Sequence, residues 1–272
     1  MAQKELSDSS TLNEIYTSLN SVLTSQKALA FTNYGNCVKL NLSKVQEAKW
    51  RDKGMPLQSL DKNFKIDEKI VKLLVIDDEE LLTHDEIIFF TENGVVKRTS
   101  MSEYFVNKSY FQAIKLKDDD CVIGVQIFDK SKSILMLSQK GMVLNFENID
   151  IPLMGRVTSG VKGMNLDEKD KIIFADQVLE SGALTVMTKN GYLKNVPIGE
   201  FEIMSRYRKG LRVYNTDSQG EIIFGKFGVV PPTLAVKTNG KLEKISSRQI
   251  PYDSRLGKGK QCVKNKIEAV YE

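Results

Sequence analysis

The residues that could do chemistry in this 272-residue chain are lysines and arginines that recur at fixed distances after a series of glycines. One group follows such a glycine by three or four positions: Lys39, Lys97, Arg98, Lys194 and Lys244. A second group follows it by fifteen to eighteen positions: Arg51, Lys53, Arg156, Arg206, Arg208, Lys209, Arg255 and Lys258. Lys162 and Lys260 lie a few positions beyond this group. Cations at regular spacing are typical of proteins that neutralise the phosphates of a long polyanion, so we predict a nucleic-acid-binding surface. For any single pair, an ordinary solvated surface is the alternative.

Other chemistry has no candidate residues. The chain has no Walker, dinucleotide-binding or zinc-protease motif and no set of residues for nucleophilic catalysis, so we predict no catalytic residue, cofactor or metal. His84 is the one histidine and is expected in a loop, and Asp118–Asp120 is expected to form a polar turn. Cys37, Cys121 and Cys262 have no CxxC spacing, so we expect buried thiols and a reducing cytosol.

The glycines that set this spacing mark an internal repeat. Each lies in a short polar turn between two apolar runs, as in "FTENGVVKRT", which is a hairpin pattern. The five turn glycines are Gly35, Gly94, Gly141, Gly191 and Gly240, separated by 59, 47, 50 and 49 positions. A second glycine follows nineteen positions later in four copies, at Gly54, Gly160, Gly210 and Gly259, and Ala113 takes its place in the remaining copy. A period near fifty with several short strands per copy indicates a radially repeated β architecture.

The predicted fold class is therefore all-β, a radial repeat of about five four-stranded blades in a β-pinwheel or propeller-like disc. The repeats are expected at about 27–76, 86–128, 133–178, 183–228 and 232–272 of one domain that spans 12–272. Residues 12–24 are expected to add an edge strand, and 1–11 to be disordered. Leu144 and Asn145 replace the first basic group in the third repeat, so its hairpin is expected to contribute least to binding. No apolar run is long enough for a membrane span.

The repeats resemble the C-terminal β-pinwheels of bacterial type IIA topoisomerase A subunits. The resemblance covers about 12–272 and rests on the order of "FTNYGNCVKL", "KWRDKGMPLQSL", "FFTENGVVKRTSMSEY", "GRVTSGVKGMNLDEKDKI" and "TKNGYLKNVPIGEF" with "SRYRKG". It implies a disc whose basic perimeter binds and bends duplex DNA without strong sequence preference. It also implies a non-catalytic part of an ATP-dependent isomerase, because in this family the catalytic tyrosine lies upstream and the ATPase is the B subunit. The rest of the A subunit and the B subunit would then be partners, in the cytoplasm and at the nucleoid.

Within the family, the sequence favours topoisomerase IV over DNA gyrase. The gyrase box Gln-Arg-Arg-Gly-Gly-Lys-Gly is missing from the first repeat, and the nearest match, "SRLGKGK" at 254–260, lies in the last. We therefore expect DNA to be bent without a full stable wrap, in a domain that senses DNA geometry and presents the transported segment. The A subunit of DNA gyrase remains the alternative, and a propeller-like module that binds proteins is the alternative from another class.

Overall fold

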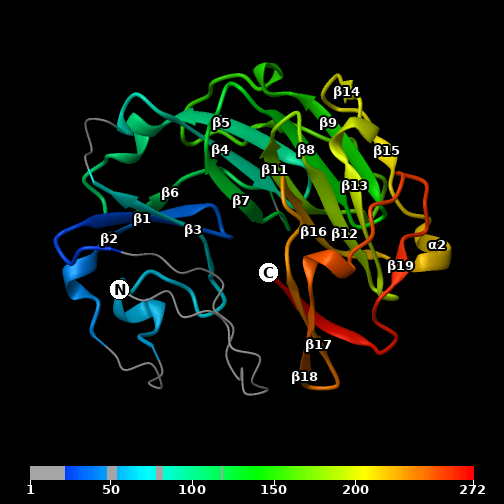
Figure 1. Cartoon of the computed structure of the whole chain (residues 1–272). Coiled ribbons are helices and arrows are strands. Elements are labelled where there is room, and N and C mark those ends of the chain that lie inside the picture. Colours follow the sequence, from blue (N-terminus) through cyan, green and yellow to red (C-terminus); the bar gives the residue numbers. More distant parts are fainter. Residues whose placement is uncertain (1–21, 48–53, 78–81, 118) are drawn as a thin grey trace.

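The computed structural model describes residues 22–47, 54–77, 82–117 and 119–272. Its strands form five small, mainly antiparallel sheets that follow one another around a ring, which confirms the predicted fold class (Figure 1). The predicted disordered segment and most of the predicted edge strand at 12–24 lie outside the described residues, and 22–24 form no strand. Within the described part of the chain, none of the helices is long and apolar enough to cross a membrane.

Each sheet is built on a hairpin at the position that the repeat predicts. The hairpins are β1 (Lys27–Thr32) with β2 (Asn36–Asn41), β4 (Glu86–Thr91) with β5 (Val95–Ser100), β8 (Ser133–Ser138) with β9 (Met142–Glu147), β12 (Ala183–Thr188) with β13 (Tyr192–Pro197), and β17 (Leu234–Thr238) with β18 (Lys241–Ile245). The five turn glycines all have φ between 72° and 81°. This left-handed conformation is strained for residues with a Cβ, which explains the recurring glycine.

A third strand from the same repeat pairs with the first strand of each hairpin. These strands are β3 (Ile70–Ile76), β7 (Val122–Ile127), β11 (Ile172–Val178), β16 (Ile222–Gly228) and β20 (Ile267–Tyr271). The pairing register shifts near the end of every one of these ladders. Along the ring, β3 contacts β7, β7 contacts β11 and β11 contacts β16, so these strands join neighbouring sheets.

In each of the first four sheets, an outer strand comes from the following repeat. These strands are β6 (Tyr110–Gln112) on β2, β10 (Val161–Lys162) on β5, β14 (Ile203–Met204) and β15 (Leu211–Arg212) on β9, and β19 (Lys260–Gln261) on β13. The fifth sheet, β18-β17-β20, has three strands among the described residues. These strands are hard to predict from the sequence because each has only two or three residues, too few to show an alternating apolar pattern.

Short helices connect the hairpins to the next segments. They are the 3-10 helices η1 (Leu42–Lys44), η2 (Leu57–Ser59), η3 (Met101–Tyr104), η4 (Asn148–Asp150), η5 (Ile198–Glu200) and η6 (Ser247–Gln249), and the helix α2 (Thr216–Gln219). Five of the six 3-10 helices directly follow, or nearly follow, the second hairpin strand, so the chain turns in the same place in each repeat.

The hydrophobic core lies between neighbouring sheets. Phe89 packs towards the first sheet, where its ring centroid is 5.6 Å from that of Phe31, whereas the next residue, Phe90, packs with Met136 and Phe146 of the third sheet. Successive side chains of a strand point to opposite faces, so both faces of a central sheet are covered. This explains why the first hairpin strands are continuous apolar runs and lack polar alternation.

Candidate nucleic-acid interface

Lys97 is buried and cannot contact DNA, so its prediction as a binding residue is wrong. Its side chain is 0% exposed, and its Nζ donates hydrogen bonds to the carbonyl oxygens of Ala113, at 3.1 Å, and of Arg156. The next residue, Arg98, lies on the opposite face of β5, is half-buried, and forms an ion pair with Glu86 at 3.2 Å. The sequence pattern treated positions three and four after the glycine as equivalent, although they face opposite ways.

Lys194 is the equivalent residue of the fourth repeat, and its prediction as a DNA contact is wrong for the same reason. It is 0% exposed, and its Nζ donates to three carbonyl oxygens of the following repeat. These acceptors are Ser254 at 3.1 Å, Arg255 at 2.9 Å and Gly257 at 2.6 Å. Three acceptors match the three N–H donors of an ammonium group. Lys194 therefore holds the backbone of a loop that itself carries basic residues.

Burial strongly affects the protonation of both amines. It lowers the pKa of Lys97 to about 7, with Glu103 raising it and Arg156 lowering it by smaller amounts. Burial likewise lowers the pKa of Lys194 to about 8, opposed by Asp253 and Glu200. Removal from water disfavours the charged form, while carbonyl acceptors favour it. Both lysines thus belong to the interior of the fold.

The third repeat has an apolar residue where the second and fourth repeats have the buried lysine. Since this position is buried in all three repeats, the change removes no charge from the surface. Leu144 occupies the position of Lys97 and Lys194 and is fully buried. Asn145 is also buried, and its Nδ2 donates to the Phe201 carbonyl oxygen at 3.1 Å. We expected this hairpin to bind DNA least because Leu144 and Asn145 replace basic residues. The burial of the Leu144 position removes that reason, since a lysine there would not reach DNA either.

Three arginines at one repeat position are half-buried and hold the donated outer strands. In each case Nη1 donates to a backbone carbonyl oxygen of such a strand. The pairs are Arg156 with Gln112, Arg206 with Lys162, and Arg255 with Arg212, the last at 2.8 Å. A guanidinium offers five N–H donors in a fixed plane, so one end can bind the backbone while the others remain for further partners.

The arginines lie in what we call the perimeter loops, residues 152–160, 202–210 and 251–259, which lead from a hairpin to the donated strand. Each loop ends at a glycine with positive φ: Gly160, Gly210 and Gly259. A Cβ at these glycines would lie 2.6, 2.2 and 2.7 Å from a carbonyl oxygen of the preceding sheet. The second glycine of the repeat therefore allows the loop to pack closely against its neighbour.

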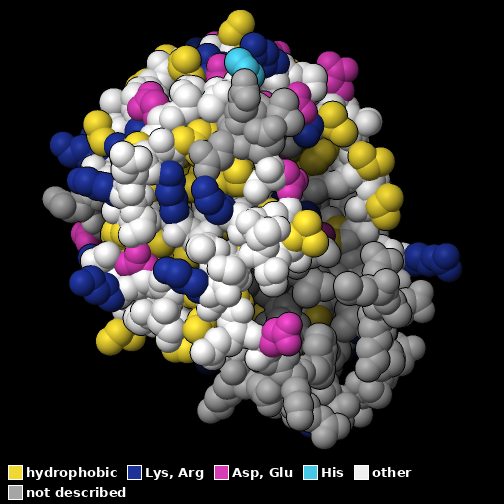
Figure 2. Space-filling model, turned by 90° about the vertical axis from the view of Figure 1, so that its left-hand side faces the viewer, with side chains coloured by type: hydrophobic (Ala, Val, Ile, Leu, Met, Phe, Trp, Pro, Cys, Tyr) yellow, Lys and Arg dark blue, Asp and Glu magenta, His cyan; other side chains and the backbone are white. Residues whose placement is uncertain are grey.

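Several of the predicted cations are exposed to solvent on the described surface. They are Lys162, Arg208, Lys209, Lys244, Lys258 and Lys260. Lys39 is half-buried, and Lys209 forms an ion pair with Asp167. Figure 2 views the molecule from the side of the first sheet and shows Lys and Arg side chains gathered mainly on the left-hand half of that face. Arg51 and Lys53 lie outside the described residues.

Arg212 was missed by the sequence reasoning and is exposed on β15. It follows its turn glycine by twenty-one positions, as Lys162 does, so the repeat spacing itself carried the signal. Among the aromatic residues near the cations, Tyr104 and Phe111 are buried in the core, whereas Tyr207 is 46% exposed. The Nζ of Lys162 lies 5.2 Å from the centroid of the Tyr207 ring.

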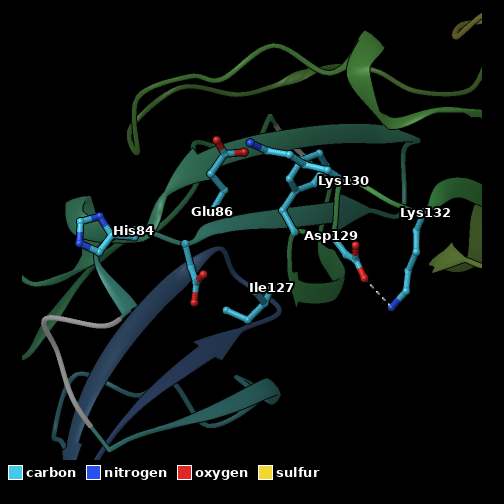
Figure 3. Close-up of a pocket in the computed structure, with 8 residues that line it drawn as sticks. His84, Glu86, Ile127, Asp129, Lys130 and Lys132 are labelled. Carbon is cyan, nitrogen blue, oxygen red and sulfur yellow. Dashed lines mark ion pairs between the residues drawn. The ribbon is translucent and has the colours of Figure 1, made fainter.

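An open surface cavity of about 490 Å³ lies beside the second sheet (Figure 3). His84, Glu86 and Lys130 line it, together with Asp129 and Lys132, which form an ion pair at 3.2 Å. In the described parts of the chain, no group of three or more His, Cys, Asp and Glu side chains could hold a metal ion. The charges of this cavity are mixed, and nothing in it forms a catalytic set.

The thiols are only partly as expected. Cys37 is buried, and that burial raises the pKa of its thiol well above the usual range. Cys121 and Cys262 are half-buried, and burial raises the pKa of Cys121 to about 11. All three are free and mainly protonated at neutral pH, which makes them poor nucleophiles.

Comparison with known proteins identifies a family over most of the chain. The family described as DNA gyrase C-terminal domain, beta-propeller, matches residues 26–77, 85–129, 132–178 and 184–225. The A subunit of DNA gyrase from Helicobacter pylori strain J99 is 36% identical over 150 residues, which are 54% of this chain and 18% of that protein. The A subunit of DNA topoisomerase 4 from Bacillus subtilis strain 168 is 29% identical over 160 residues, 58% of this chain and 20% of that protein. The chain thus spans about a fifth of the length of these relatives.

Two solved structures have the same fold. The C-terminal domain of DNA topoisomerase IV has a TM-score of 0.83 and 26% identity, with 91% of this chain and 79% of that chain covered. The DNA gyrase A C-terminal domain has a TM-score of 0.68 and 22% identity, with 92% and 83% covered. The relatives include both DNA gyrase and DNA topoisomerase IV. The comparisons therefore identify the family but do not decide between these two enzymes.

Proposed function

Because this chain belongs to the family of DNA gyrase C-terminal β-propeller domains, we propose that it binds and bends duplex DNA as a non-catalytic domain of a type IIA topoisomerase A subunit. The observation that carries the proposal is the set of exposed cations at repeated positions on the donated strands and perimeter loops. Lys162 and Arg212 occupy one repeat position, and Lys209 and Lys258 occupy another. Phosphate contacts of this kind fix the path of a duplex without reading its sequence.

Within the family, we propose the A subunit of topoisomerase IV as the parent protein. The missing gyrase box supports this, as does the likeness to the C-terminal domain of DNA topoisomerase IV, which is 26% identical with a TM-score of 0.83. The domain would present the transported DNA segment and sense its geometry, with the rest of the A subunit and the ATPase B subunit as partners. Its place would be the cytoplasm, at the nucleoid. The A subunit of DNA gyrase is the second candidate, favoured by the 36% identity of the Helicobacter pylori protein.

A salt titration of duplex binding tests the DNA proposal. If about five phosphates are neutralised, the logarithm of the binding constant falls against the logarithm of salt concentration with a slope of about −4 to −5. Duplexes of unrelated sequence should give similar curves, because phosphates are the main contacts. No binding at low salt, or a slope near zero, would reject DNA binding and favour a propeller-like module that binds proteins.

A further inference from the structure

Two rows of exposed apolar side chains run along the perimeter loops at fixed repeat positions. The first row, twelve positions after the turn glycine, contains Leu153, Ile203 and Tyr252, which are 53%, 51% and 59% exposed. The second row, sixteen positions after it, contains Val157, Tyr207 and Leu256, which are 55%, 46% and 74% exposed. Single exposed apolar residues are common, but the same exposure at the same two places in three successive repeats needs an explanation.

The first row has the same backbone setting in each copy. Its residues lie beside the residue four positions after the turn glycine of the preceding sheet, and the local strand direction is parallel. The pairs are Leu153 with Arg98, Ile203 with Asn145, and Tyr252 with Asn195. Equivalent pairing places these side chains at equivalent points on successive sheets.

We call the second row the tip row. Its backbone is held by hydrogen bonds from groups in the interior of the fold. The carbonyl of Arg156, just before Val157, accepts from Lys97, and the carbonyls on both sides of Leu256 accept from Lys194. In the fourth repeat, the Tyr207 N–H donates to the Gly163 carbonyl oxygen at 2.7 Å.

Tyr207 also has a φ of 66°, which is rare for a residue with a bulky side chain. Backbone outliers of this kind persist where the surroundings hold them and often occur at binding sites. The backbone contacts thus keep these three apolar side chains exposed to solvent. A partner that covers them would remove their apolar surface from water, which is favourable.

The surroundings of the tip row are cationic, which indicates what that partner is. Arg208 and Lys209 follow Tyr207, and Lys258 and Lys260 follow Leu256, all exposed. Lys162 lies over the ring of Tyr207 with its Nζ 5.2 Å from the centroid. Apolar side chains between exposed cations match the minor groove of DNA, where apolar side chains insert between base steps and bend the duplex.

We propose that the tip row, Val157, Tyr207 and Leu256, inserts into the minor groove of DNA held by the neighbouring cations and helps to bend it. This inference rests on the proposed function, because it assumes that the perimeter loops bind a duplex. The cations supply the salt-dependent part of binding, and the tip row supplies a part that does not depend on salt. The two contributions can therefore be separated.

The test compares an apolar variant with a charge variant of the full chain. The triple variant Val157→Ser, Tyr207→Ser and Leu256→Ser is titrated against a fluorescent duplex over a range of salt concentrations, and the bend is measured by energy transfer between dyes at its ends. We expect binding to weaken by about three- to tenfold at every salt concentration, with an unchanged slope and a smaller bend. The triple variant Lys162→Gln, Arg208→Gln and Lys258→Gln should instead flatten the slope by about 3, one unit for each lost phosphate contact.

A matched control is the double variant Ile66→Ser and Val230→Ser, which removes apolar side chains that are 97% and 75% exposed outside the perimeter loops. It should bind and bend DNA as the wild type does, and melting temperatures show whether each variant is folded. Unchanged bending by the tip-row variant, or a change of its salt slope, would overturn the inference without affecting the proposed DNA binding. If the variant binds DNA normally but no longer binds the rest of the enzyme, the tip row makes a protein contact and the inference is wrong. Failure of the wild type to bind DNA at all would instead reject the proposed function.

Discussion

At the residue scale, the same residue type serves two purposes that sequence spacing alone does not separate. Lys97 and Arg98 are neighbouring basic residues, yet Lys97 is buried under the next repeat and Arg98 is only half-buried, with its guanidinium paired to Glu86. The sequence correctly predicted that basic residues keep a fixed place in the repeat. It could not predict their direction, because the segment that covers Lys97 comes from Arg156, far along the chain.

Replacement of Lys194 by methionine should loosen the loop that its amine holds. The Lys194→Met variant leaves three carbonyl oxygens without their donor, while Leu144 shows that an apolar side chain fits this place in the third repeat. We expect the free energy of unfolding at pH 7 to fall by about 1–3 kcal/mol, measured by urea denaturation. DNA binding by the folded variant should keep its salt slope, since Lys194 is not at the surface. A flatter slope would return Lys194 to the binding surface.

The same variant should also change how stability depends on pH. Burial lowers the pKa of Lys194 to about 8, against about 10.4 in an unfolded chain, so the unfolded chain binds more protons between these values. Stability therefore gains a contribution as pH rises from about 8 to about 10, which is lost again as pH falls towards 8. We expect the difference in unfolding free energy between wild type and Lys194→Met to grow over this range. Parallel pH profiles would show that the amine stays charged in the folded protein.

At the element scale, the sequence predicted the hairpins well. It did not predict that an outer strand of each of the first four sheets is donated by the following repeat. The turn glycines and apolar runs placed β4, β5, β8 and β9 correctly, because these signals are local. The donated strands have two or three residues each, and pairing with a different repeat leaves no periodic pattern in the chain. The second glycine of the repeat was visible in the sequence, and the structure gives its reason in three of the four copies, where Gly160, Gly210 and Gly259 approach the preceding sheet closely. Gly54, in the first repeat, makes no such approach.

Gly210→Ala should strongly destabilise the exchanged strand of the third sheet. Gly210 has a φ of 79°, and a Cβ would lie 2.2 Å from the Val143 carbonyl oxygen, so both the backbone and the neighbouring strand would have to move. We expect a loss of about 2–4 kcal/mol in unfolding free energy. Gly54→Ala is the matched control, because nothing lies within 4 Å of the added Cβ, and it should change stability by less than about 0.5 kcal/mol. Similar urea midpoints for the two variants would contradict the packing role of the second glycine.

At the scale of the whole molecule, the small net charge of +4 conceals a distribution that depends on the fold. Two of the predicted basic positions are buried, and three arginines are partly engaged with donated strands. The exposed predicted cations include Lys209 and Lys258 on the perimeter loops and Lys162 and Lys260 on donated strands. Fewer free cations than the sequence suggested are therefore left to hold DNA. Each further arc of bent DNA must be stabilised by further contacts, since bending a site of 20–30 base pairs costs about 1–6 kcal/mol.

This distribution predicts bending without a full stable wrap. Nicked circular DNA is sealed by ligase in the presence of increasing amounts of the protein, and the change in linking number is then read from the topoisomers. We expect little or no change in linking number together with a clear bend in short duplexes, because the burial of Lys97 and Lys194 leaves fewer exposed cations to contact phosphates around the ring. Wrapping with a fixed hand would instead shift the linking number until the effect saturates. A strong, saturating positive shift would contradict the proposed topoisomerase IV role and favour DNA gyrase, since that result needs contacts that follow the DNA around most of the perimeter.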